Sequence, residues 1–216
     1  MPSNSNLGRK RVLKRSFDLF SAMLLLVILS PILLILFILV WVFMGWPVIF
    51  SQSRPGLHGK IFNLYKFRTM RSSNTLGGRP LPDEVRLTGL GRFMRSFSLD
   101  ELPELCNVLR GEMSLVGPRP LLIAYLERYT SEQSRRHDVP PGITGWAQVN
   151  GRNALPWEEK FKLDLWYVEH GTFALDLKIL ILTAWKVFKR ESINAPGNRT
   201  PPEFMGDATP QNHPRD

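Results

Sequence analysis

Two adjacent carboxylates, Asp100 and Glu101, stand where the stretch 98–105 turns from a loop into a predicted helix. The spacing of Ser98 and Glu101 has the form of a capping box, in which the two side chains cap the helix start. An alternative start places Asp100 at the N-cap and Pro103 in the first turn, where the missing N–H of proline costs nothing. Either start puts acidic groups beside unpaired backbone N–H groups, which favour anions.

Basic residues flank this acidic pair in the sequence. Arg92 and Arg95 precede it, and Gly117-Pro118-Arg119-Pro120 follows the predicted helix. Acidic residues in a first turn often do no more than stabilise the helix, and that explanation would suffice for the pair alone. Carboxylates set among arginines also suit a phosphate that a metal ion bridges, because carboxylates bind hard cations and arginine binds phosphate. The neighbours of the pair therefore favour phosphate chemistry.

Composition limits the partners of the chain. The 216 residues carry 28 basic and 19 acidic side chains, a net charge of +9, which indicates an anionic partner. Nucleic acid, anionic lipid and a phosphorylated substrate all fit this charge. Cys106 is the only cysteine, so an intrachain disulfide is excluded, which is consistent with a location facing the cytoplasm.

Residues 22–44 form an almost wholly apolar run that is interrupted only by Ser30 and Pro31. At roughly 1.5 Å per residue, the run is long enough to cross a hydrocarbon core of about 30 Å as a single-pass anchor. A re-entrant helix that enters one leaflet and returns is the alternative, because proline kinks a helix and each half alone is too short to span. Both flanks are basic, and the positive-inside rule then draws both ends to the cytoplasm. Composition leaves these two alternatives open.

The next part of the chain predicts a short β-hairpin, with strands over 48–52 and 60–68 joined by a Gly- and Pro-containing turn. Lys66 and Arg68 alternate on one face of the second strand, where they are candidates for contact with phosphate or lipid headgroups. Residues 72–82 predict a flexible loop.

Four further segments complete the prediction. Residues 121–136 have a helical pattern, and His137 after them is interpreted as structural. A rigid turn over 140–146 precedes Gly151 and Arg152, where glycine allows close backbone approach and arginine is a phosphate donor. Helices follow over 156–170 and 173–190. The second is basic, amphipathic and contains tryptophan, so it either lies in a membrane interface or packs on the domain core.

The motifs together resemble the bacterial sugar transferases of the monotopic phosphoglycosyl transferase family, close to its small PglC type. The similarity covers roughly residues 12–190, in family order. The matching stretches are Lys14-Arg15-Ser16-Phe17-Asp18, Ser30-Pro31, Arg54-Pro55-Gly56, Tyr65-Lys66-Phe67-Arg68-Thr69-Met70, Arg95-Ser96-Phe97-Ser98-Leu99-Asp100-Glu101-Leu102, Val116-Gly117-Pro118-Arg119-Pro120, Pro141-Gly142-Ile143-Thr144-Gly145-Trp146 and Gln148-Val149-Asn150-Gly151-Arg152.

The resemblance implies an α+β, mainly helical fold. A re-entrant membrane helix broken at Ser30 and Pro31 would occupy residues 1–46. A small cytoplasmic catalytic domain with a β-hairpin and interfacial amphipathic helices would occupy 47–191, and 192–216 would be a disordered tail. The expected location is the inner membrane of a bacterium, on one leaflet, with both termini and the active site facing the cytoplasm.

The resemblance also implies an activity. Family members transfer a sugar 1-phosphate from a UDP-sugar to undecaprenyl phosphate, release UMP and require Mg²⁺, in the first membrane step of glycoconjugate biosynthesis. The family's catalytic acid pair corresponds to Asp100 and Glu101. Our hypothesis is that Asp100 is a nucleophile that forms an aspartyl-phosphosugar intermediate, and that Glu101, with Asp100, binds the metal. The candidates for holding phosphates are Lys66, Arg68, Arg95, Arg119 and Arg152.

Other function classes fit less of the sequence. A non-catalytic, membrane-anchored basic module that binds lipid or protein explains the charge and the apolar run, but not the acids among arginines. A nucleic-acid-binding protein lacks a recognition motif, and a membrane-bound phosphatase would not depend on a polyprenyl phosphate acceptor. Membrane lipid and downstream glycosyltransferases are the expected partners. The sequence does not identify the sugar, the glycan pathway or the oligomeric state.

Overall fold

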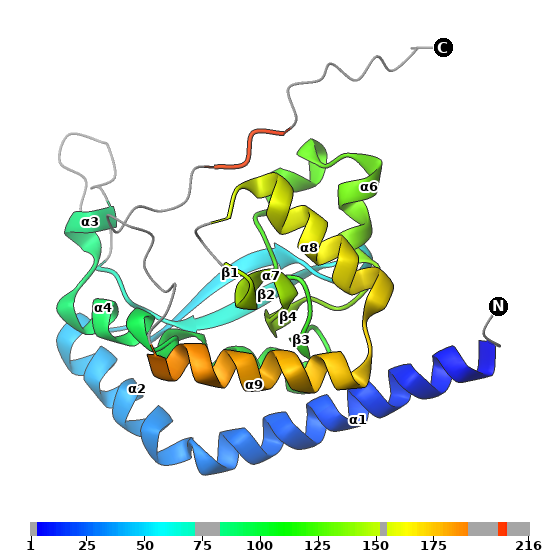
Figure 1. Ribbon diagram of the computed structural model, residues 1–216. Coiled ribbons are helices and arrows are strands. Elements are labelled where there is room, and N and C mark those ends of the chain that lie inside the picture. Colours follow the sequence, from blue (N-terminus) through cyan, green and yellow to red (C-terminus); the bar gives the residue numbers. More distant parts are fainter. Residues whose placement is uncertain (1–3, 72–82, 152–154, 190–202, 207–216) are drawn as a thin grey trace.

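The computed structural model describes residues 4–71, 83–151, 155–189 and 203–206. The fold is mainly helical, as predicted, with two small two-stranded sheets. Two long N-terminal helices form an open V along one side of the molecule, and the remaining elements lie in its opening (Figure 1). The predicted boundary at residue 191 falls outside the described residues.

The N-terminal helices are α1 (Asn4–Ile28) and α2 (Ser30–Met44), and their described segments 12–28 and 30–44 meet at 64°. Pro31 lies in the first turn of α2, and the Ser30 hydroxyl donates a hydrogen bond to the Val27 carbonyl at 2.8 Å. The helix therefore breaks at the predicted position. Among the described residues, no single helix is long and apolar enough to cross a membrane, and this bent pair passes the same criteria only when its halves are combined.

Polar side chains of α1 attach it to the rest of the chain. Arg15 donates to the carbonyls of Val108 and Leu109 at 2.6 and 3.0 Å. The buried Asp18 accepts from the Ser114 hydroxyl at 2.8 Å and from the Leu115 N–H at 3.2 Å. These bonds supply partners to groups whose burial would otherwise be costly, and they hold α1 in one position relative to the domain.

The predicted hairpin is present. Strands β1 (Ile49–Pro55) and β2 (Ile61–Phe67) pair antiparallel, with Phe50 opposite Lys66 and Arg54 opposite Phe62. The 3₁₀ turn η1 (Leu57–Gly59) joins the strands. Helices α3 (Asp83–Arg86) and α4 (Gly89–Ser96), the 3₁₀ turn η2 (Leu99–Glu101) and helix α5 (Glu104–Arg110) follow.

Two short strands were not predicted. β3 (Ser114–Val116) and β4 (Gly142–Thr144) pair in parallel, and β4 lies inside the predicted rigid turn 140–146. Three-residue strands leave too little alternation for a sequence pattern to reveal.

The helix predicted over 121–136 is wrong as one element. It consists of the 3₁₀ segment η3 (Ile123–Arg128), helix α6 (Ser131–Ser134) and the 3₁₀ turn η4 (Arg135–His137). Thr130 and Gln133 form a capping box that starts a new short helix in the middle of the range.

The C-terminal helices agree with the prediction. Helix α7 (Trp146–Val149) precedes α8 (Trp157–His170), which begins after Pro156, and α9 (Phe173–Lys189), which runs alongside α1 in Figure 1. Most of the tail predicted to be disordered lies outside the described residues. Its described stretch, 203–206, buries Phe204 in an aromatic cluster with Tyr125, Tyr129 and Phe161.

Glycines allow a close backbone crossing beneath β3 and β4. A Cβ on Gly117 would lie 2.3 Å from the Pro140 carbonyl oxygen, and one on Gly142 would lie 2.1 Å from the Gly117 nitrogen. Because backbone atoms would have to move, a side chain at either position would separate the segments. The crossing positions the segment that leads into Arg119, and the Gly142 N–H donates to the Pro118 carbonyl at 3.0 Å.

We expect Gly117→Ala to lower the stability of the protein by about 1–3 kcal/mol or more, because the added methyl group overpacks a backbone contact. Thermal unfolding in detergent, followed by circular dichroism, measures the effect. Gly89→Ala is the matched control, since a Cβ there meets nothing within 4 Å. Equal melting temperatures for the two variants would contradict the crossing as a constraint.

Candidate active site

The acidic pair lies in a 3₁₀ turn rather than in a helix start. Ser98 adopts the left-handed conformation (φ 55°), and its backbone carbonyl accepts from the Glu101 N–H at 3.2 Å. Helix α5 begins at Glu104, with Pro103 at the N-cap. The predicted start at Ser98 is therefore correct for the 3₁₀ turn, of which Ser98 is the N-cap residue without a side-chain cap, but the α-helix begins only at Glu104. The alternative start with Asp100 at the N-cap is wrong, because Asp100 lies inside the 3₁₀ turn.

A shared carboxylate oxygen joins segments that are far apart in the sequence. Oε1 of Glu101 accepts from Lys66 Nζ on β2 at 2.9 Å and from Arg119 Nη2 at 2.6 Å. Lys66 also pairs with Glu104 Oε1 at 3.1 Å. Asp100 and Glu101 are each only 8% exposed, and Glu104 is 3% exposed. Glu101, Glu104, Lys66 and Arg119 thus form one ion-pair network, and the buried Asp100 adjoins it through Glu101.

Burial perturbs the carboxyl groups. The pKa of Asp100 is raised by burial and then by the charge of Glu101, while Lys66, Arg95 and Arg119 act in the opposite direction. Burial raises the pKa of Glu104 to about 7, although Lys66 opposes the shift. Buried carboxyl groups with perturbed pKa values and nearby cations are typical of functional sites.

The predicted phosphate-binding residues fall into three groups. Lys66, Arg95 and Arg119 all lie close enough to lower the pKa of Asp100, and Arg95 also donates to Thr69 Oγ1 at 3.1 Å. The structure therefore brings these three cations together at the acidic pair. Arg152 lies outside the described residues.

Arg68 is occupied elsewhere. Its guanidinium donates to the carbonyls of Met44, Gly45 (2.9 Å) and Trp46 (3.2 Å), at the end of α2. Cations are favoured there because the last carbonyls of a helix lack partners within the helix. The structure places Arg68 at the junction of α2 and β1 and shows no contact between it and the acidic pair.

Two residues of the site were not among the predicted ones. Glu104 follows Glu101 by three residues. Side chains at this spacing lie on the same side of a helical turn, so the spacing could have identified Glu104. Arg54, in the Arg54-Pro55-Gly56 motif, lines a cavity of about 30 Å³. The other lining residues are Leu64, Lys66, Glu104, Arg119 and Pro120.

The carboxylates of the site can bind Mg²⁺ together with oxygens from a substrate. Within the described part of the chain, no group of three or more His, Cys, Asp or Glu side chains is arranged to hold a metal ion. Mg²⁺, however, commonly uses one or two carboxylates and completes its shell with water and substrate phosphate oxygens. Asp100 and Glu101 supply two adjacent carboxylates, so the residues present fit a metal that arrives with a phosphorylated substrate.

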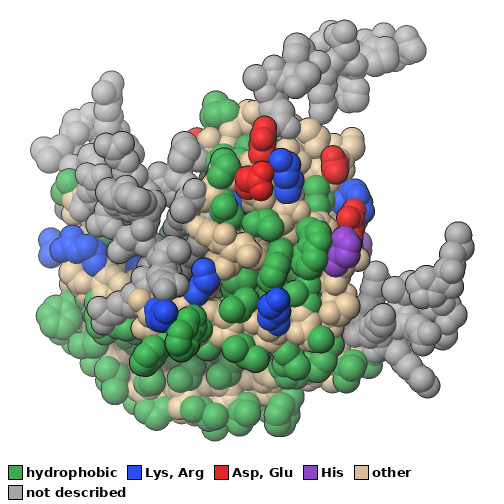
Figure 2. Space-filling model, viewed as in Figure 1, with side chains coloured by type: hydrophobic (Ala, Val, Ile, Leu, Met, Phe, Trp, Pro, Cys, Tyr) green, Lys and Arg blue, Asp and Glu red, His purple; other side chains and the backbone are tan. Residues whose placement is uncertain are grey.

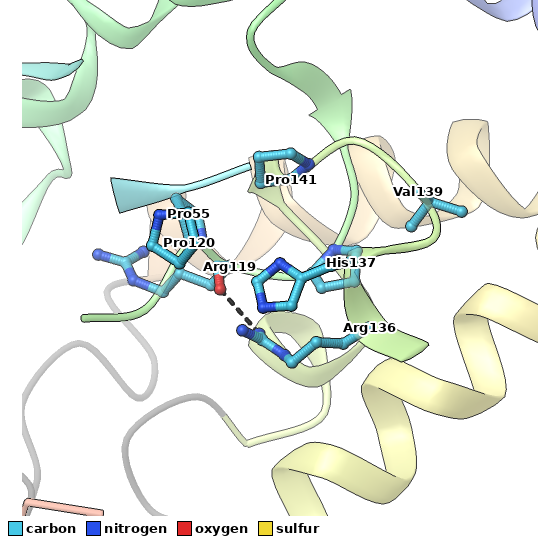
Figure 3. Close-up of a pocket in the computed structure, with 8 residues that line it drawn as sticks. Pro55, Arg119, Pro120, Arg136, His137, Val139 and Pro141 are labelled. Carbon is cyan, nitrogen blue, oxygen red and sulfur yellow. Dashed lines mark hydrogen bonds between the residues drawn. The ribbon is translucent and has the colours of Figure 1, made fainter. Parts of the chain in front are cut away.

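The backbone of Arg119 is held by a buried ion pair. Arg136 donates to the Arg119 carbonyl at 2.8 Å and pairs with Asp164 at 2.7 Å. Figure 3 shows the Arg119 carbonyl facing Arg136, while the Arg119 side chain extends to the other side. His137, beside Arg136, is buried, and its Nδ1 lies 3.1 Å from the Gly56 carbonyl oxygen. This position is consistent with the structural role predicted for His137.

The chain is similar in sequence to a known protein family and to several of its members. The sequence profile described as bacterial sugar transferase matches residues 9–190. The chain is 57% identical over 195 residues to the uncharacterized sugar transferase EpsL of Bacillus subtilis, covering 90% of this chain and 96% of that protein.

Two larger relatives are named for specific reactions. The undecaprenyl-phosphate galactose phosphotransferase of Salmonella typhimurium is 39% identical over 206 residues, covering 87% of this chain and 43% of that protein. The UDP-glucose:undecaprenyl-phosphate glucose-1-phosphate transferase of Escherichia coli is 39% identical over 191 residues, covering 84% and 41%. The chain spans less than half the length of these two proteins.

We expect His137 to make the protein sensitive to acid. Burial, and then the charge of Arg136, lowers its pKa from 6.5 to about 4. Its contribution to stability is therefore full above pH 6.5 and is lost as the pH falls through about 4, because the unfolded state binds the proton first. His137→Asn should flatten the fall in melting temperature over this range. His170→Asn, at an exposed position, is the control, and a fall as steep as wild type in His137→Asn would contradict the assignment.

Proposed function

The chain belongs to the bacterial sugar transferase family and is a transferase, and we propose that it moves a sugar 1-phosphate from a UDP-sugar to undecaprenyl phosphate, releasing UMP. The observation that carries the proposal is the buried Asp100 beside Glu101, with Lys66, Arg95 and Arg119 around it. The names of the two larger relatives support the substrates. The product, an undecaprenyl diphosphate sugar, would begin the assembly of a bacterial glycoconjugate, on which downstream glycosyltransferases would act.

In the first half-reaction, a carboxylate oxygen of Asp100 attacks the phosphorus that carries the sugar. The bond between this phosphorus and the bridging oxygen breaks, and UMP leaves with the electron pair. An aspartyl-phosphosugar remains. Lys66 and Arg119 bind the phosphate oxygens, and Arg95 adds positive charge beside Asp100, so the growing negative charge is offset where it develops.

In the second half-reaction, a phosphate oxygen of undecaprenyl phosphate attacks the same phosphorus. The bond to Asp100 breaks, the carboxylate is regenerated, and the lipid diphosphate sugar is released. The attacking oxygen is already ionised in a phosphate, so the chain has no need of a base to remove its proton. This agrees with the lack of any role for the buried His137 in the site.

Mg²⁺ is the proposed cofactor, with Asp100 and Glu101 as its protein ligands. When bound, it would neutralise charge on the diphosphate and on the departing UMP. Lys66 and Arg119 both donate to Oε1 of Glu101 and so hold its carboxylate in one orientation.

The apolar surface supports a position on the membrane. Figure 2 shows hydrophobic side chains gathered along the lower face, where Figure 1 places α1 and α2. Exposed residues there include Phe20, Val27 and Leu34, and α9 beside α1 exposes Ile181, Trp185 and Phe188. We propose that the bent pair enters one leaflet of the bacterial inner membrane and returns, with both termini and the site facing the cytoplasm. A lipid-linked phosphate at the membrane surface then reaches the site without leaving the bilayer.

Asp100→Asn should abolish transfer, because the amide is a poor nucleophile. Intact-protein mass, measured in detergent with Mg²⁺ and a panel of UDP-sugars but no lipid, should show a phosphosugar adduct in the wild type and none in the variant. Undecaprenyl phosphate should then discharge the adduct. Removing Mg²⁺ with EDTA should stop adduct formation.

Asp138→Asn is the matched control, since Asp138 is exposed and outside the site. Full transfer by Asp100→Asn would refute the nucleophile. Release of UMP only when lipid is present, without any adduct, would instead support direct transfer. No release of UMP with any sugar would favour the non-catalytic anchored module.

Cysteine labelling tests the re-entrant arrangement. Exposed Ser16 and Ser51 lie on opposite sides of the bend, and each is changed to Cys in a Cys106→Ser background, because the native Cys106 is exposed. A membrane-impermeant maleimide should label both positions in inside-out vesicles and neither in intact spheroplasts. Labelling from opposite sides would show a single-pass anchor.

A further inference from the structure

Arg54 is a partly buried cation at the site that the mechanism above leaves unused. Its Nη2 donates to Gln52 Oε1 at 2.7 Å, while its buried Nε has no hydrogen-bond partner. Among the described residues it forms no ion pair within 4 Å, unlike Lys66 and Arg119. A buried N–H donor without a partner is costly unless a ligand accepts from it.

The surroundings of Arg54 carry an excess of positive charge. Among the described residues, Arg54, Lys66 and Arg119 line one cavity of about 30 Å³ together with one carboxylate, Glu104. Glu101 bonds to Lys66 and Arg119 from outside this lining and, within the described part of the chain, leaves Arg54 without a carboxylate partner. Burial and the neighbouring Arg119 lower the pKa of Arg54, so the two guanidinium groups repel each other. Burial also raises the pKa of Glu104 to about 7. An anion is the ligand that would offset this excess.

The strand register sets the order of the cations. Lys66 lies opposite Phe50, and Arg54 lies four residues further along β1 on the same face, about 13 Å away at the backbone. Arg119 lines the same cavity and bonds to Glu101, which adjoins Asp100. Lys66 also bonds to Glu101, whereas Arg54 bonds to Gln52. The register therefore places Arg54 at the end of the cluster away from Lys66 and from the acidic pair that Lys66 contacts.

We propose that Arg54 binds the nucleotide phosphate of the UDP-sugar, the one that departs as UMP, while Lys66 and Arg119 hold the phosphate attacked by Asp100. This assignment rests on the proposed function, since it places the two phosphates of a UDP-sugar at the two ends of one cluster of cations. The cavity as it stands has room for about one or two water molecules. Phosphate oxygens would take this space, and the Arg119 side chain that lines it is 39% exposed, so it is accessible to a ligand.

UMP binding tests this proposal without knowledge of the sugar. Equilibrium binding of UMP to the full chain in detergent with Mg²⁺ is measured by calorimetry for wild type, Arg54→Gln and Arg54→Lys. Arg54→Gln should weaken UMP binding about tenfold or more, and Arg54→Lys should lose less, because lysine keeps the charge but not the planar fork. The KM for undecaprenyl phosphate, measured in the transfer assay, should not change.

Arg135→Gln is the matched control, since Arg135 is 47% exposed on its side chain and pairs with Glu169 away from the site. Melting temperatures separate loss of fold from loss of binding, and Arg54→Lys remains informative if Arg54→Gln fails to fold. Unchanged UMP binding in a folded Arg54 variant overturns the proposal. A raised KM for undecaprenyl phosphate with normal UMP binding also overturns it, because it would place Arg54 on the acceptor side. Wild-type protein that binds UMP through Arg54 but transfers no phosphosugar would refute the proposed function alone.

Discussion

One oxygen atom of Glu101 connects the parts of the site. It accepts from Lys66 on the hairpin and from Arg119 after β3, so the 3₁₀ turn, the hairpin and the segment 118–120 meet at a single buried carboxylate. Breaking a buried ion pair by removing one member leaves the others unpaired, at a cost of about 3–5 kcal/mol. The ion pairs of Glu101 therefore orient this carboxylate and also hold Lys66 and Arg119, two of the phosphate-binding candidates, beside Asp100.

This cluster is connected to the bent helix pair through α5. The helix begins at Glu104, which pairs with Lys66, and the carbonyls of Val108 and Leu109 near its other end accept from Arg15 of α1. Lys14 reaches the buried Asp176 of α9 at 2.7 Å, so α1 and α9, which both expose apolar side chains, are joined as well. These contacts fix the site relative to the apolar helices, as the proposed reaction with a lipid-linked phosphate requires.

Much of the fold follows from local patterns. Alternation predicted the hairpin, proline and the apolar run predicted the break at Ser30 and Pro31, and Pro156 with a helical period predicted α8. The missed elements are short. β3 and β4 are three residues each and exist because Gly117 and Gly142 allow the two backbones to touch. Such contacts between distant segments produce no repeating pattern of apolar residues in either segment, so sequence patterns do not reveal them.

The residue types and motifs of the sequence alone determined the family resemblance, the acidic pair and the set of basic candidates. Only the tertiary structure decided which candidates act together: Lys66, Arg95 and Arg119 gather at Asp100, whereas Arg68 caps the end of α2. It also added Glu104 and Arg54, whose importance depends on burial and on neighbours up to 66 residues away. The physical reason is that a side chain's type is local, while its charge balance, solvation and partners arise from segments brought together by folding.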